Sequence, residues 1–98
     1  MRDGVHLAAD VYLPPGKGPW VVLLERTPYG RRGTNHADCS LREPEPLSKP
    51  QVALRFAAAG YAYVLQDCRG RFDSEGKFEK YLNEQRDGVD TLQWILRQ

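Results

Sequence analysis

The sequence predicts an α/β fold with a mostly parallel sheet, and three observations support that prediction. Two short apolar runs, residues 20–24 and 61–65, have the continuous hydrophobicity of strands covered on both faces. The segment between them ends in an alanine-rich, apolar stretch typical of a helix. A strand, a helix and a second buried strand, in that order, form the unit that joins parallel strands in α/β proteins.

The first element is predicted to be a half-buried strand. Apolar residues occupy the odd positions from Val5 to Leu13, which is the period of two expected when one face of a strand is covered. Asp3-Gly4 just before it is a turn signal of β-hairpins. Because no strand precedes Met1, we expect the chain to start inside a hairpin.

The second strand, residues 20–24, is expected to end in a sharp turn over Arg26–Gly30. Pro28 favours an extended conformation at Thr27, and Gly30 permits a sharp exit. A long polar loop then covers residues 31–47. Connections of that length tend to be functional loops or disordered segments.

Two helices and one more strand complete the predicted order. The first helix begins at Ser48 or Lys49, has Pro50 near its first turn and ends at Gly60. The strand 61–65 closes on Gln66-Asp67 and is followed by a polar loop to residue 79. Asn83 is a good N-cap for a second helix, with Val89, Leu92, Ile95 and Leu96 at the spacing of an apolar face and with Asp87, Asp90 and Gln93 largely on the other side. A further parallel strand is expected after this helix, so both ends of the chain look cut.

Composition places the chain among ordinary globular domains. Its 98 residues suffice for one domain, and 14 Lys+Arg against 13 Asp+Glu leave a net charge of +1. That balance argues against a nucleic-acid partner, and no apolar run is long enough to cross a membrane. No secretion signal opens the chain, so a cytoplasmic location and free thiols at Cys39 and Cys68 are expected.

The chemistry is expected at the carboxyl ends of the parallel strands, where α/β folds place their sites. Two segments qualify, residues 26–30 and residues 67–76. Neither strand is followed by a glycine-rich nucleotide motif, so no cofactor is expected.

These segments carry a family resemblance. The chain contains, in order, the opening M-R-D-G-V-H-L-A-A-D-V-Y, the turn R-T-P-Y-G, the runs Q-D-C-R-G and S-E-G, and a last run from N-E through D-G and D-T to W-I. The same motifs occur in the same order in the cocaine esterase (CocE/NonD) family. The chain resembles that family, which includes X-Pro dipeptidyl-peptidases and α-amino acid ester hydrolases, over nearly its whole length except the loop 31–47.

The resemblance implies the N-terminal portion, residues 1–98, of an α/β-hydrolase catalytic domain. Such enzymes cleave esters or amides with a Ser–Asp–His triad whose serine stands in a G-x-S-x-G elbow. No such elbow occurs here, so we expect the chain to stop before the nucleophile and to lack all three triad residues. The resemblance assigns one catalytic role: Tyr29 would donate its phenolic O–H to the oxyanion of the tetrahedral intermediate.

Several other residues invite functional interpretations that their contexts disfavour. Asp67 and Arg69 are expected to pair with each other or to hold loop backbone, because the triad acid of this fold follows the serine. Cys68 is expected to be a small buried thiol. His6 and His36 lack partners at metal-ligand spacing, so no metal is expected. Asp87 and Asp90 suggest a solvated or salt-bridged helix face, and Phe72 and Phe78 are expected to fold their loop over the sheet.

Two hypotheses for function follow. In the first, the chain is part of a serine hydrolase that takes a small ester or peptide substrate, and the isolated chain is inactive. In the second, it is a non-catalytic module whose exposed sheet edges pair with another chain or form homo-oligomers. For Tyr29, the alternative to the oxyanion role is an aromatic side chain that caps the sheet edge.

Overall fold

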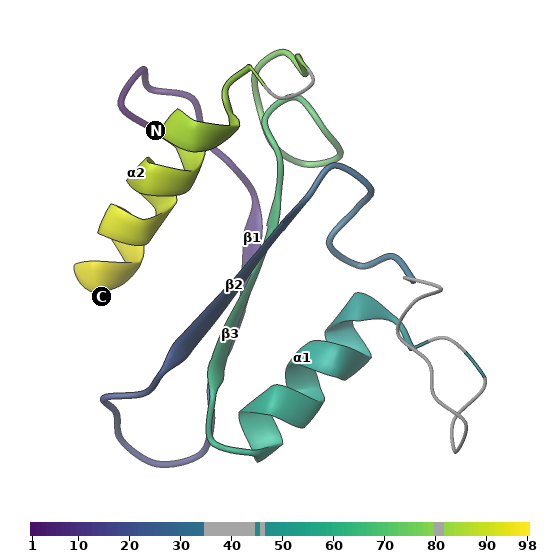
Figure 1. The fold of residues 1–98 in the computed structure, drawn as a ribbon, viewed down its shortest axis with the longest axis vertical. Coiled ribbons are helices and arrows are strands. Elements are labelled where there is room, and N and C mark those ends of the chain that lie inside the picture. The colour runs from purple at the N-terminus through teal and green to yellow at the C-terminus, as the bar shows by residue number, and fades with distance from the viewer. Residues whose placement is uncertain (35–44, 46, 80–81) are drawn as a thin grey trace.

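The computed structural model describes residues 1–34, 45, 47–79 and 82–98. Three strands form one sheet in the order β1-β3-β2, with β2 parallel and β1 antiparallel to β3. The elements are β1 (Ala9–Tyr12), β2 (Val22–Thr27), α1 (Lys49–Ala58), β3 (Ala62–Asp67) and α2 (Glu84–Leu96) (Figure 1). The α/β class, the parallel pair and the two helices are therefore confirmed.

The bounds of the first two strands differ from those predicted. β1 covers only Ala9–Tyr12, because the residues before it contact the loop after β3 instead: the Ala8 N–H donates to Ser74 Oγ (2.9 Å) and the Glu75 N–H to the His6 carbonyl (2.9 Å). β2 starts two residues later than expected and includes Arg26 and Thr27. Its extent follows its partner, since it pairs with β3 from Val22 to Thr27.

β3 is the centre of the fold, and all six of its residues are buried. Successive residues of a strand face opposite sides of a sheet, so every second residue shares a side. On one side Tyr63 and Leu65 pack with Ala53 of α1, and Tyr12 and Leu23 join this cluster. On the other side Gln66 faces α2, where Thr91 Oγ1 donates to its side-chain oxygen (2.9 Å). The helices thus lie on opposite sides of the sheet (Figure 1).

α1 begins and ends where the sequence predicts. Ser48 is its N-cap, and it forms a capping box with Gln51: Ser48 Oγ accepts from the Gln51 N–H, and the Gln51 side chain accepts from the Ser48 N–H. Pro50 lies in the first turn, where no backbone donor is needed. Gly60, with φ of +97°, follows the C-cap residue. The predicted loop 31–47 lies mostly outside the described residues.

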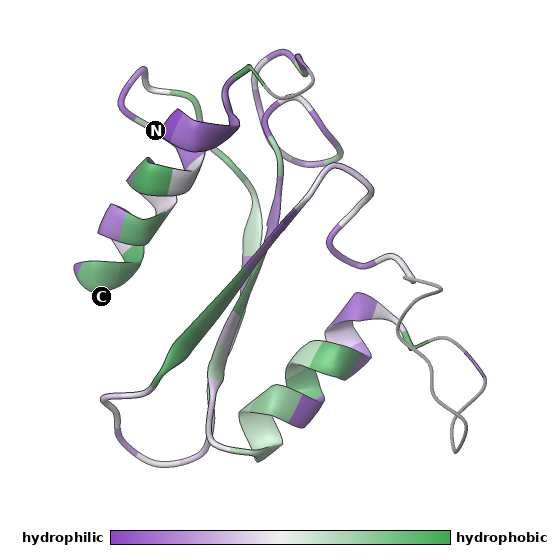
Figure 2. Cartoon of the chain, in the orientation of Figure 1, coloured by the Kyte–Doolittle hydropathy of each residue, from purple (hydrophilic) through white to green (hydrophobic). Residues whose placement is uncertain are grey.

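α2 turns the face opposite to the predicted one toward the protein. Its buried residues are Asp87, Asp90 and Thr91, whereas Leu92 and Leu96 are 51% and 83% exposed. Charged partners explain the difference, since Arg69 and Arg2 reach the two aspartates. Figure 2 shows hydrophobic colour on α2 beside hydrophilic turns. No helix in the described part of the chain is long and apolar enough to cross a bilayer.

Candidate active-site region at the strand ends

The carboxyl ends of β2 and β3 lie side by side, as predicted. Thr27 is in register with Asp67, and the Cys68 N–H donates to the Thr27 carbonyl (3.0 Å). The turn after β2 and the loop after β3 therefore leave the sheet together. Figure 2 shows the same division along β2, whose first half is hydrophobic and whose second half, toward the turn, is hydrophilic.

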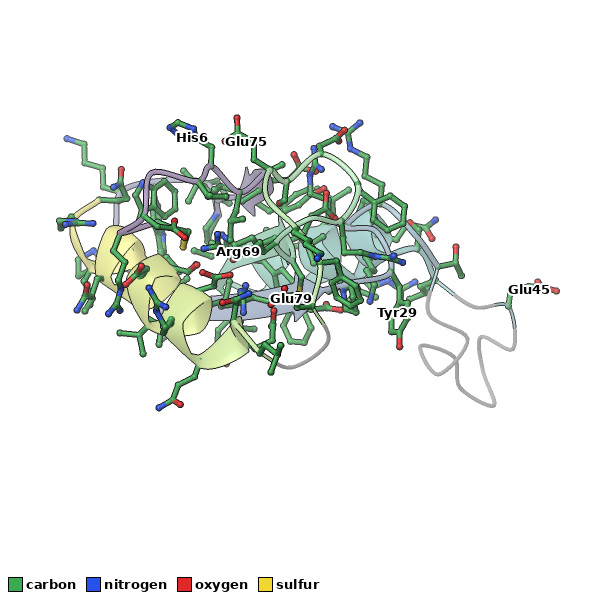
Figure 3. All side chains as sticks on the ribbon, turned by 90° about the horizontal axis from the view of Figure 1, so that it is seen from above. His6, Tyr29, Glu45, Arg69, Glu75 and Glu79 are labelled. Atoms are coloured by element: carbon green, nitrogen blue, oxygen red, sulfur yellow. The ribbon has the colours of Figure 1, made fainter. Side chains whose placement is uncertain are left out.

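Tyr29 lies on the turn that leaves β2. Its backbone N–H donates to Thr27 Oγ1 (3.0 Å), and Gly30 follows with φ of +96°, in the left-handed region that favours glycine. Space beside it is also limited, because a Cβ there would lie 3.1 Å from the Phe72 ring, which would have to shift slightly. The tyrosine side chain itself is 76% exposed and points away from the ribbon (Figure 3).

Two hollows flank Tyr29. One, of about 290 Å³, lies toward α2 and is lined by Arg26, Pro28, Cys68, Arg71, Phe78 and Glu84. The other, of about 270 Å³, follows the turn from Gly30 to Gly33 and reaches Phe72 and Asp73. Within the described part of the chain, the Tyr29 hydroxyl has no hydrogen-bond partner. The phenolic O–H is therefore available to an acceptor placed beside the turn. No hydrogen bond among the described residues supports the alternative in which Tyr29 caps the sheet edge.

Asp67 and Arg69 do not pair with each other, so that part of the prediction is wrong. Asp67 is fully buried, and its carboxylate accepts from the backbone N–H of Arg31 (2.8 Å) and from Arg31 Nη1 (2.5 Å). Arg69 instead contacts Asp87 and Asp3. Asp67 is the last residue of β3, whereas Arg69 lies in the loop that follows, where its side chain reaches α2 and the start of the chain. The prediction that these side chains bind loop backbone is confirmed for Asp67, which accepts from the Arg31 N–H.

Cys68 is a buried free thiol, as predicted. Burial and the nearby Glu84 carboxylate raise the pKa of the thiol to about 11, and Sγ lies 3.6 Å from Glu84 Oε2. A thiol with so high a pKa holds almost no thiolate at neutral pH, and thiolate is the nucleophilic form. The cysteine is therefore not an activated nucleophile. Cys39 lies outside the described residues.

His6 and Glu75 form an exposed pair. His6 Nδ1 is 3.2 Å from Glu75 Oε2, and both side chains are mostly in solvent (Figure 3). The nearby Ser74 hydroxyl is already used, since it donates to the Asp67 carbonyl (2.7 Å) and accepts from the Ala8 N–H. This pair therefore orders the start of the chain against the loop and activates no hydroxyl. His36 lies outside the described residues.

Arg31 and Arg71 are contributors that the sequence interpretation missed. In the sequence Arg31 is only one half of a short basic pair in a loop, but its side chain is only 10% exposed. Arg71 Nε donates to the Pro28 carbonyl (2.8 Å), and its guanidinium lies over the rings of Phe72 and Phe78. Phe72 is 64% exposed, and its ring lies against Gly30 of the turn. The available signal in the sequence was weak: an arginine lies four residues beyond the end of each of the two parallel strands, Arg31 after Thr27 and Arg71 after Asp67.

The described residues of this region can donate hydrogen bonds to an anion, and none of them is an activated nucleophile. The chain is similar in sequence to known proteins. Residues 3–98 match the family model of the X-Pro dipeptidyl-peptidases (S15 family). The chain is 43% identical over 98 residues to the cocaine esterase of Rhodococcus sp. (strain MB1 Bresler), a match that covers all of this chain and 16% of that protein.

Two solved structures resemble the fold. An α-amino acid ester hydrolase is similar with a TM-score of 0.71 and 30% identity, over 99% of this chain and 17% of its own. An aminopeptidase from a marine sediment archaeon (Thaumarchaeota archaeon) is similar with a TM-score of 0.70 and 31% identity, over 99% and 17%. The chain thus spans 16% or 17% of the length of these relatives.

Proposed function

Since this chain belongs to the X-Pro dipeptidyl-peptidase (S15) family, we propose that it forms the oxyanion-binding part of a serine hydrolase domain that acts on esters or amides. The sequence contains no G-x-S-x-G elbow, so in this proposal the serine, the acid and the histidine come from outside residues 1–98. The substrate is a small ester or peptide, in keeping with the names of the relatives.

The observation that supports the proposal best is the state of Tyr29. Its hydroxyl is unpartnered within the described chain, and its backbone is fixed at the end of a strand. Attack of a serine on an ester carbonyl turns the carbonyl oxygen into an oxyanion. A donor already in place stabilises that charge without reorganisation when the charge develops, and this is the source of its catalytic effect.

Replacing Tyr29 by phenylalanine tests this role. The protein is the cocaine esterase of Rhodococcus sp. with its matching segment replaced by residues 1–98 of this chain, assayed on p-nitrophenyl acetate. We expect Tyr29→Phe to lower kcat by about 10²–10³, as loss of one oxyanion donor does, with a small change in KM.

Tyr61→Phe is the matched control, because Tyr61 lies at the opposite end of β3 and is also partly exposed. Its kcat is expected to equal that of the parent chimera. A Tyr29→Phe variant with unchanged kcat would refute the oxyanion role. The isolated 98-residue chain should take up no fluorophosphonate probe, and stoichiometric labelling of it would refute the assignment of the nucleophile to other residues.

A second candidate function is favoured by the sheet. β1 and β2 are its outer strands, and in the described part of the chain neither pairs on its outer side. Unpaired strand edges bind other strands, so the chain would act as a strand-pairing module, with copies of itself or with another polypeptide. This candidate predicts association without catalysis, which sedimentation of the purified chain measures directly.

A further inference from the structure

We propose that Asp67 is a positioning residue for Tyr29: from the end of β3, its buried carboxylate sets the conformation of the turn that carries the tyrosine. The inference rests on the proposed function of Tyr29. It adds a residue that reaches neither the substrate nor the phenol and that acts through the backbone of the turn.

The position of Tyr29 depends on its backbone because its side chain makes no hydrogen bond to a described residue. The ring is 76% exposed, and its hydroxyl contacts no described residue. The position of the phenolic O–H therefore depends on where the backbone of residue 29 lies. Small displacements of a catalytic group are costly, since a shift of about 1 Å can lower a rate by about 10².

Three side chains fix the backbone of the turn. Thr27 Oγ1 accepts from the N–H of Tyr29 (3.0 Å), and Arg71 Nε donates to the carbonyl of Pro28 (2.8 Å). Asp67 Oδ1 accepts from the N–H of Arg31 (2.8 Å), two residues beyond the tyrosine. The turn is thus held before, at and after Tyr29.

Asp67 differs from the other two in burial and in charge. Its side chain is wholly inaccessible, and its second oxygen accepts from Nη1 of the same Arg31 whose N–H bonds the first. One carboxylate therefore holds residue 31 at two points. Arg31 also contacts Asp10 and Asp73, but both of these carboxylates are more exposed than Asp67. Of the three, Asp67 is the one that also accepts from the backbone N–H of Arg31. The contact therefore keeps the turn in one conformation.

The register of the sheet places the Asp67 carboxylate beside the turn. Asp67 pairs with Thr27, the last residue of β2, so the two strands end at the same level. Its backbone is held as well, since its N–H donates to the Ala8 carbonyl (3.0 Å) and its own carbonyl accepts from Ser74 Oγ (2.7 Å). The carboxylate is consequently a fixed point against which the turn is placed.

A double-mutant cycle in the cocaine esterase chimera tests the inference. Asp67→Ala removes both contacts to Arg31, and we expect it to lower kcat by about 10–10² with KM within about twofold. Asp67→Asn keeps an acceptor for the Arg31 N–H and should restore part of that loss. In the Tyr29→Phe background, Asp67→Ala should lower kcat by less than about threefold, because the group it positions is gone.

The outcomes separate the two proposals. If Asp67→Ala lowers kcat by the same factor in both backgrounds, its role is only structural and the inference is overturned, while the role of Tyr29 stands. If Tyr29→Phe alone leaves kcat unchanged, the proposed function fails and this inference fails with it. Asp90→Asn is the matched control, because Asp90 is also a buried carboxylate paired with an arginine, Arg2, but lies on α2 and lines neither hollow beside Tyr29. Its kcat should remain at the parent value.

Amide hydrogen exchange of the 98-residue chain covers the case of an Asp67→Ala chimera that does not fold. In that variant of the chain we expect faster exchange at the N–H groups of Tyr29, Arg31 and Gly33, with α1 unchanged. Equal acceleration over the whole chain, or none at the turn, would overturn the inference.

Discussion

Among the described residues, the Asp90 carboxylate accepts hydrogen bonds from Arg2, which lies 88 positions away in the sequence. The backbone N–H of Arg2 donates to Oδ2 (2.9 Å), and Nη2 of its guanidinium donates to Oδ1 (2.6 Å). These bonds lower the pKa of Asp90 from its ordinary 3.8 to about 2. A carboxyl group whose pKa is lower in the folded state stabilises the fold where it is ionised, and this contribution disappears as the pH falls toward the folded pKa.

Asp90→Asn should therefore flatten the acid limb of the stability curve. The parent chain is expected to lose urea resistance between about pH 4 and pH 2, because Asp90 becomes protonated there. The variant should be less stable at pH 7 and lose less over that range. The measurement is the urea midpoint of unfolding at several pH values, with tryptophan fluorescence as the signal.

Glu45→Gln serves as the control, since this exposed carboxylate points away from the rest of the chain (Figure 3). It should leave the acid limb as steep as in the parent. If Asp90→Asn shows the same slope as the parent between pH 4 and pH 2, the ion pair with Arg2 contributes nothing to acid stability.

Among the elements, the loop from Cys68 to Glu79 connects the strand ends to α2 and supplies Arg71 to the turn. It folds back on itself at Gly70, whose N–H donates to the Glu75 carbonyl (2.9 Å). Gly70 has φ of +71°, and a Cβ there would lie only 2.0 Å from the backbone nitrogen of Phe78. The loop therefore closes only if residue 70 has no side chain.

Gly70→Ala should destabilise the chain by more than Gly60→Ala, and the pair isolates the steric part of the effect. Both glycines have positive φ, but a Cβ at residue 60 would meet nothing within 4 Å. At Gly60 we expect only the backbone cost of a left-handed alanine, about 1–2 kcal/mol. At Gly70 the clash with backbone adds to this cost, and the loop must open.

Thermal or urea unfolding measures both variants. In the esterase chimera, Gly70→Ala should also lower kcat, because Arg71 and Phe78 lie on the displaced loop and Arg71 holds Pro28. Equal destabilisation by the two alanines would show that the loop can accommodate a side chain at residue 70.

The molecule as a whole exposes many large hydrophobic side chains. In the described chain, large hydrophobic side chains are exposed beside β2 and on both helices, among them Val21 (64%), Leu54 (58%) and Leu96 (83%). The sheet has two outer strands, and Val21 lies directly before the first residue of one of them. Apolar surface beside an unpaired strand edge favours association with another polypeptide.

The 98-residue chain alone should therefore associate as its concentration rises, as measured by sedimentation velocity. If the chains associate through the edge of β2, Val21→Lys should weaken the association, because a lysine beside an edge strand opposes strand pairing. Leu54→Lys, which places the same charge on α1, should have a smaller effect. A chain that sediments as a monomer at all concentrations would contradict this prediction.

The sequence alone determined the class of the fold and which two strand ends lie side by side. Local signals were sufficient for α1, because Ser48, Pro50 and Gly60 act within a few residues of themselves. They were also sufficient for the parallel pair, because residues 62–65 of β3 form a continuous apolar and aromatic run, and these residues are buried. The family resemblance drawn from ordered motifs is confirmed by the match over residues 3–98. The meeting of the two strand ends followed from the geometry of parallel strands.

Only the tertiary structure decided which charges are buried. Arg31 binds Asp67 across 36 positions, and α2 buries Asp87 and Asp90 because Arg69 and Arg2 reach them. A local pattern cannot predict this, since the orientation of a helix depends on which of its faces finds partners, and a paired carboxylate can be buried where an unpaired one cannot. Hydrophobic periodicity located α2 correctly, but ion pairs distant in sequence determined its orientation.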